Sequence, residues 1–129
     1  MFELILKYYF ERSRQALVLS CSISIFAQDE LKTIRNENAD KAVALFEQFK
    51  TFTVNTPCQP NDQACIDSSF AKCFTTLNDA GELVNVWSLD KCNAGLSCVV
   101  LPLVNSRGVS LVCATEQERL DRIAQARAA

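Results

Sequence analysis

The residues of this 129-residue chain with the clearest chemical potential are its seven cysteines. Six of them fall in one window, separated by 6, 7, 18, 5 and 14 residues. None forms a Cys-x-x-Cys motif, so neither a zinc ribbon nor a thioredoxin-like redox site is expected. An even number of clustered cysteines predicts three disulfides, and six cysteines allow 15 pairings. The six are Cys58, Cys65, Cys73, Cys92, Cys98 and Cys113.

Catalytic chemistry is poorly represented. The chain has no histidine, which excludes Ser-His-Asp and Cys-His sites and the His-Glu-x-x-His metalloprotease motif. The carboxylates of Asp79, Glu82 and Asp90 could hydrolyse glycosides only if a cleft held them in pairs. A 57-residue stapled domain offers little cleft, and no Asp-x-Asp-x-Asp calcium loop is present. We therefore expect no enzyme, no cofactor and no metal.

Charge and the N-terminal segment indicate where the chain acts. A net charge of -2 lacks the basic footprint of a nucleic-acid-binding protein. In residues 1–27, basic residues precede an uncharged run over residues 16–27, which predicts an atypical signal peptide that carries Cys21 away with it. This run is too short to span a bilayer, so no stable membrane insertion is expected after its removal. A mispredicted start, or a membrane-anchored or cytosolic N-terminus, stays open as an alternative.

The segment over residues 28–57 is predicted to be a helical lead. Residues 29–52 place Phe46, Phe49 and Phe52 at three-residue steps, which is typical of an amphipathic helix. A cap at Asn38 or Asp40 is also plausible, because Asn and Asp favour helix starts. The phenylalanine stripe has two interpretations: a partner or membrane surface, or packing against the disulfide domain. An amphipathic helix usually buries its stripe, which favours the second.

Residues 58–114 are predicted to form a disulfide-stapled module of two β-hairpins, and residues 115–129 a short C-terminal helix or tail. The fold class is thus small, disulfide-rich and mainly β, with an N-terminal amphipathic helix. The second hairpin would bring Cys98 near Cys113, so these two are expected to pair. The predicted strands are residues 69–77 and 83–89, joined by residues 78–82, and residues 98–104 and 109–114, joined by residues 105–108.

The order of the cysteines and of some residues between them is distinctive. It runs Cys58-x6-Cys65, Phe70-Ala71-Lys72-Cys73, Trp87 before Cys92, Cys92-Asn93-Ala94-Gly95-Leu96-Ser97-Cys98, and Gly108 before Cys113. This order resembles carbohydrate-binding module family 19, the small chitin-binding domains of fungal secreted proteins. The longer resemblance, to stand-alone proteins that carry this module, covers residues 39–126.

Two kinds of departure from the family bear on sugar affinity. Family members often carry glycine where this chain has Asn61 and Ser68. Glycine there would permit positive φ or the close approach of a ligand, and Asn tolerates that geometry better than Ser. The Cys73–Cys92 segment is also longer than usual, with an insertion over residues 75–85. The fold survives such changes more easily than sugar affinity does.

Sugar binding would need an aromatic ring for the C–H face of a pyranose and polar groups for its hydroxyls. Trp87 is the best stacking candidate, together with Phe70 or Phe74. In so small a domain these rings could instead form the core, which is the favoured interpretation for Phe70 and Phe74, whereas neither interpretation is favoured for Trp87. Alternation along a strand puts Phe70 and Phe74 on one face with Lys72, and Ala71 and Cys73 on the other. The polar candidates of the site are Asn85 and Asp79, with Asn78 and Asp90 close to the same hairpin.

The sequence therefore predicts a secreted, non-catalytic module that binds chitin, an N-acetylglucosamine polymer, at a fungal cell wall. One alternative is a secreted interaction protein, such as an effector or an inhibitor, that keeps the scaffold without sugar affinity. Another is a structural component of the wall, for which the phenylalanine stripe would have to be exposed. A buried Trp87 would favour the interaction protein.

Overall fold

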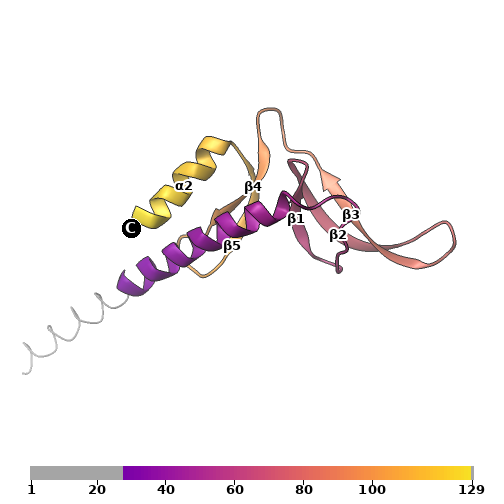
Figure 1. The fold of residues 1–129 in the computed structure, drawn as a ribbon, viewed down its shortest axis with the longest axis horizontal. Helices are drawn as coiled ribbons and strands as arrows, with labels where there is room; N and C mark the ends of the chain where they lie inside the picture. Colours follow the sequence, from indigo (N-terminus) through magenta and orange to yellow (C-terminus); the bar gives the residue numbers. More distant parts are fainter. Residues whose placement is uncertain (1–27, 129) are drawn as a thin grey trace, which may run out of the picture.

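The computed structural model describes residues 28–128 as a mixed helical and stranded domain with three disulfides (Figure 1). Its two helices hold about as many residues as its five strands. The expectation of a mainly β fold is therefore correct for the disulfides and the strands, but it understates the helices. The predicted signal peptide, with Cys21, lies outside the described residues.

The N-terminal helix occupies residues 28–49 of the described chain. The expected cap at Asn38 or Asp40 is wrong, because the helix continues through both residues. Asn38 is instead buried, with 3% of its surface exposed. Its side-chain amide donates to the carbonyl oxygens of Leu103 and Ser106, at 2.9 and 2.8 Å, and its Oδ1 accepts from the Gly108 backbone N–H at 2.9 Å. This residue fastens the helix to a loop 65 or more positions away.

The strands form two antiparallel sheets. The first has the order β1 (Gln63–Ile66), β2 (Ser69–Leu77) and β3 (Leu83–Asp90), and the second pairs β4 (Ser97–Pro102) with β5 (Val109–Ala114). Figure 1 shows the β2–β3 hairpin reaching away from the helices. The four predicted strands are present, with small differences at their ends, but β1 was not predicted.

The β1–β2 connection explains why that strand was missed. Only Asp67 and Ser68 join the two strands, and both have positive φ, 50° and 66°, as in a type I′ turn. The sequence signal for such a turn is Asn-Gly or Asp-Gly, which this chain lacks. Ser68 also links the two sheets, because its carbonyl oxygen accepts the Cys98 backbone N–H at 2.9 Å.

The disulfides cross-link the layers. Cys58–Cys73 ties the segment before β1 to β2, Cys65–Cys98 joins the two sheets, and Cys92–Cys113 ties the β3–β4 connector to β5. The expected Cys98–Cys113 bond is therefore wrong. These two residues do face each other across β4 and β5. Sheet packing, however, brings the Cα of Cys65 within 5.4 Å of that of Cys98, and the connector brings Cys92 within 5.6 Å of Cys113.

The C-terminal helix α2 (Glu116–Ala128) is docked against the domain. Thr115 and Glu118 form a capping box, in which each side chain accepts the other's backbone N–H at 3.1 Å. Ile123 and Ala126 are buried against Ala39 of the N-terminal helix. The segment predicted as a short C-terminal helix or tail is a helix packed on the domain.

Candidate functional site

Trp87 serves largely as a packing residue. It lies on β3 opposite Cys73 and is half-buried against the main core cluster. Its indole N–H donates to the Thr56 carbonyl oxygen at 2.8 Å, and its ring lies 6.3 Å from that of Phe52. The tryptophan therefore holds the turn after the N-terminal helix against the sheet.

The expected platform of Trp87 with Phe70 or Phe74 is not formed, because the register separates them. Trp87 pairs with Cys73, whereas Phe74 pairs with Val86. Directly opposed residues share a face and neighbours along a strand alternate, so Trp87 lies on one face of the hairpin and both phenylalanines on the other. Phe70 is half-buried against the core, and Phe74 is 44% exposed.

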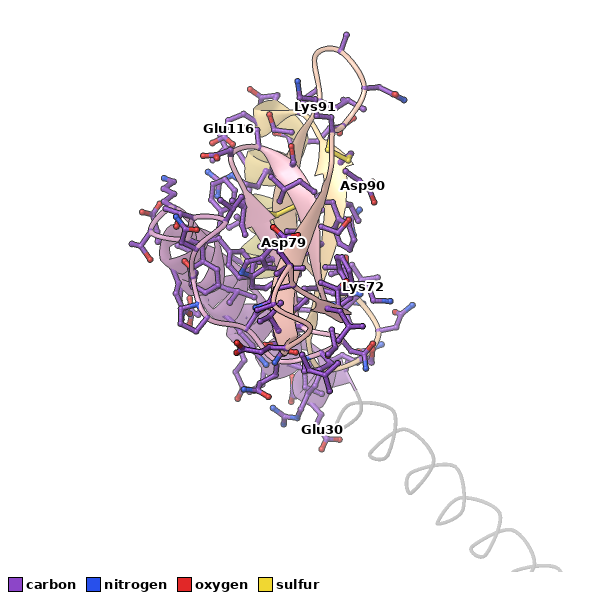
Figure 2. All side chains as sticks on the ribbon, turned by 90° about the vertical axis from the view of Figure 1, so that its right-hand side faces the viewer. Glu30, Lys72, Asp79, Asp90, Lys91 and Glu116 are labelled. Atoms are coloured by element: carbon purple, nitrogen blue, oxygen red, sulfur yellow. A yellow bond between two sulfur atoms is a disulfide. The ribbon has the colours of Figure 1, made fainter. Side chains whose placement is uncertain are left out.

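The exposed Phe74 belongs to a shallow depression of about 460 Å³ on this outer face, which we call the Phe74 depression. Besides the ring, the lining offers an amide, an ammonium, a hydroxyl and a carboxylate. The carboxylate, Asp90, lies opposite Phe70, four residues along β3 from the position opposite Phe74. Figure 2 shows Lys72 and Asp90 on the same side of the hairpin, projecting from β2 and β3. The depression is lined by Pro60, Asn61, Lys72, Cys73, Phe74, Thr75, Ser88 and Asp90.

The segment before β1 forms one wall of this depression and is held there by the backbone. The Asn61 N–H donates to the Cys73 carbonyl oxygen at 3.0 Å, and the Cys73 N–H donates to the Asp62 carbonyl oxygen at 2.8 Å. The Cys58–Cys73 disulfide fixes the same segment covalently. Asn61 adopts φ 73°, a left-handed conformation that Asn tolerates. The backbone of Asn61 is thus held in place beside the depression.

The other predicted polar residues lie elsewhere. Asn85 is exposed on the Trp87 face, where its Oδ1 accepts the Thr75 hydroxyl at 2.8 Å. Asp79 is exposed in the loop at the end of the hairpin (Figure 2), about 13 Å or more along β3 from the level of Trp87. The five candidates are therefore distributed over two faces and a loop. Only Phe74 of the five lines the depression.

The residues that join Phe74 were only partly accessible to sequence reasoning. Lys72 follows from alternation along β2. Ser88 and Asp90 require the β2–β3 register, since Ser88 lies opposite Lys72 and Asp90 opposite Phe70. Placing Asn61 beside the depression requires knowledge of the backbone hydrogen bonds between its segment and Cys73. Its departure from the glycine of family 19 was the one signal that pointed to it.

The phenylalanine stripe of the N-terminal helix packs inward. Phe49 is 7% exposed, and Phe46 and Phe52 are partly buried against the core. The guanidinium carbon of Arg119 lies 4.5 Å from the Phe46 ring centroid. Nη2 of the same guanidinium forms an ion pair with Glu116 Oε1 at 2.6 Å. The hydrogen bond from Arg119 lowers the pKa of Glu116 and, reciprocally, raises that of Arg119. These charges and rings stabilise the fold where α2 begins.

Comparison with family models, with curated proteins and with solved structures found no match to this chain. Within residues 28–128, no helix is both long and apolar enough to cross a membrane. In the same residues, no group of three or more acidic, histidine or cysteine side chains is arranged to hold a metal ion.

Proposed function

We propose that this chain is a secreted, non-catalytic module that binds chitin through the Phe74 depression. The observation that carries the proposal is an exposed phenylalanine on a sheet face, in a depression that Asn61, Lys72, Ser88 and Asp90 also line. A pyranose offers an apolar C–H face and an edge of hydroxyls. Phe74 can stack on the first, while the surrounding amide, ammonium, hydroxyl and carboxylate can bond to the second.

The shape of the depression supports binding without bond cleavage. It is open and shallow, so a polymer can lie across it without threading into a cavity. No water-excluding cleft encloses Asp90, the one carboxylate in its lining, and glycoside hydrolysis needs two carboxyl groups across the scissile bond. The expected contact is therefore stacking with hydrogen bonds at its rim. Bound to wall chitin, such a module would tether, mask or organise the wall.

The backbone supports the relationship to family 19. Asn61 and Ser68, where family members often have glycine, have φ of 73° and 66°, values that glycine adopts readily. Three disulfides suit an oxidising, extracellular environment. Both features support the proposal of a scaffold like that of family 19 in a secreted protein.

The first experiment is retention of the oxidised protein on insoluble chitin, cellulose and xylan. Phe74→Ala should reduce the affinity for chitin about tenfold, equivalent to ~1.4 kcal/mol, because the stacking surface is lost. The matched control is Leu83→Ala, which removes an exposed apolar side chain of the same hairpin outside the depression. It should bind like the parent. Near-identical circular dichroism spectra would establish that both variants are folded.

Two outcomes would contradict the proposal in different ways. Full retention of Phe74→Ala would exclude the Phe74 depression. Trp87→Phe, which keeps a ring but removes the bond to Thr56, would then test the opposite face. No retention of the parent protein on any polymer would exclude sugar binding altogether.

The alternative function, a secreted interaction protein, has two supporting observations. Trp87 is half-buried and its indole N–H is bonded to Thr56, which leans toward this function. Leu77 and Leu83 face each other at the end of the hairpin and are 64% and 75% exposed. Such an apolar pair is typical of protein-contact surfaces. If the parent protein fails to bind any polysaccharide, Leu77 and Leu83 become the residues to mutate against a protein partner.

A further inference from the structure

The three disulfides differ in their exposure to solvent. Both cysteines of Cys58–Cys73 and both of Cys65–Cys98 are buried, with exposed fractions of 7% or less. In the third bond Cys113 is exposed and Cys92 is partly exposed. A thiolate must reach a sulfur atom directly to exchange with a disulfide, so access decides which bond reacts. The buried pairs must first open by partial unfolding.

Cys113 also lines an open depression of about 460 Å³ between the β4–β5 sheet and α2. Apolar atoms of Leu101 and Val112 form part of its lining, and Arg122, Asp121 and Glu118 bring charges of both signs. By alternation along β5, the side chain of Cys113 lies on the other face of the sheet from Val112 and Ala114, so this depression borders the strand and not the sulfur atoms. Access to the bond therefore rests on the exposure of Cys113 itself. Neither of the other two disulfides has an exposed cysteine.

We propose that Cys92–Cys113 is a site of thiol–disulfide exchange with small extracellular thiols, and that it opens while the other two disulfides stay closed. A thiolate bonds to the sulfur of Cys113, and Cys92 leaves as a thiolate that takes a proton from water. A second thiol then attacks the small-molecule sulfur of the mixed disulfide and releases Cys113. In total two thiols are oxidised to one disulfide, and the protein gains two electrons and two protons.

The consequence of reduction is local. Cys65–Cys98 still joins the two sheets, and Cys58–Cys73 still fixes the wall of the Phe74 depression. The element that is freed is the β3–β4 connector, residues 91–96. It keeps one internal backbone hydrogen bond, from the Leu96 N–H to the Asn93 carbonyl oxygen at 3.0 Å. The exchange is thus a redox device that loosens one connector and leaves the core intact.

The test is limited reduction with mass mapping. Free thiols of the oxidised protein are blocked with N-ethylmaleimide, graded reduced glutathione is added, and new thiols are trapped with iodoacetamide. Label should enter Cys92 and Cys113 at least ~10-fold faster than the other four cysteines. Hydrogen exchange should rise over residues 91–96 and stay low in β4. Equal labelling of all six, or earlier labelling of Cys65 or Cys98, would overturn the proposal.

The control is the double variant Cys92→Ala, Cys113→Ala. At the glutathione concentrations that label the parent protein, this variant should take up no iodoacetamide. Label in the variant under those conditions would mean that the buried disulfides are themselves accessible, and would overturn the selectivity. Because the order of labelling is measured in the parent protein, the proposal stays testable even if the variant fails to fold.

Discussion

Strands β3 and β4 have similarly apolar sequences but opposite exposure. In β4, the five residues from Cys98 to Pro102 are all buried, whereas in β3 five of eight residues are exposed. Yet β3 contains two leucines, two valines and a tryptophan. Apolar content therefore does not decide which of these two strands is buried.

The position of each strand in the topology decides it. Alternate residues of β4 enter two different clusters, Val100 with the N-terminal helix and β1, and Val99 with Leu101 and Ala114. β4 also contacts α2, so both of its faces are covered. β3 is the last strand of its sheet and pairs only with β2. β4 is therefore a core strand, and β3 leaves much of its surface open to solvent.

The largest test of this contrast is the same substitution made in each sheet. Leu101, 7% exposed, and Leu83, 75% exposed, are both changed to alanine. Leu101→Ala should lower the free energy of unfolding by ~2–5 kcal/mol because it leaves a cavity. Leu83→Ala should change it by less than ~0.5 kcal/mol. Urea unfolding with the disulfides intact measures both changes. Comparable losses would refute the contrast between the core strand β4 and the open strand β3.

A second pair of variants compares the asparagines that organise each sheet's hairpin loop. Buried Asn38 bonds to three backbone groups of the β4–β5 loop, and Asn38→Ala would leave them unpaired, at a cost of ~2–3 kcal/mol. Exposed Asn78 accepts the N–H groups of Ala80 and Glu82 in its own loop. Water can replace those bonds, so Asn78→Ala should cost ~0.5–1 kcal/mol. An Asn78→Ala loss as large as that of Asn38→Ala would contradict this account.

Asn38 also marks the limit of sequence reasoning in this protein. Local patterns identified what depends on neighbours along the chain, including the four longer strands, both helices and the use of the six cysteines as staples. The partners of Asn38 lie 65 to 70 residues away, and no local pattern encodes them. The propensity of Asn for helix caps therefore gave the wrong role.

The same limit applied to the disulfides and to the candidate site. Cys98 and Cys113 were predicted as neighbours, which they are, but their bonds depend on how the sheets and the connector pack. Alternation correctly separated Phe74 from Cys73. It could not show that Trp87 shares the face of Cys73, because that needs the β2–β3 register.

A smaller, stabilising effect is expected at the junction between the sheets. Ser68 has φ 66°, which is unfavourable for a residue with a Cβ. Ser68→Gly removes the backbone strain but makes the unfolded chain more flexible, which offsets part of the gain. The free energy of unfolding should rise by ~0.5–1 kcal/mol net. Asn61→Gly should gain less, because Asn tolerates this backbone region. Thermal unfolding of both variants measures the difference, and a destabilised Ser68→Gly would show that its side chain contributes more than its backbone costs.

The smallest expected effect concerns the Glu116–Arg119 ion pair in the first turn of α2, the helix that packs against β4. The hydrogen bond from Arg119 holds the pKa of Glu116 below its ordinary value of 4.5, so near that pH the unfolded chain binds more protons than the folded one. The stabilisation is present above the unfolded pKa and is lost as the pH falls through the folded value. Because the Glu116 side chain is 61% exposed, solvent screening keeps it under ~1 kcal/mol. Urea unfolding should show Glu116→Gln below the parent protein at pH 6 and a shrinking gap as the pH falls below 4.5. A gap that widens on acidification would mean that the carboxylate is disfavoured in the folded state.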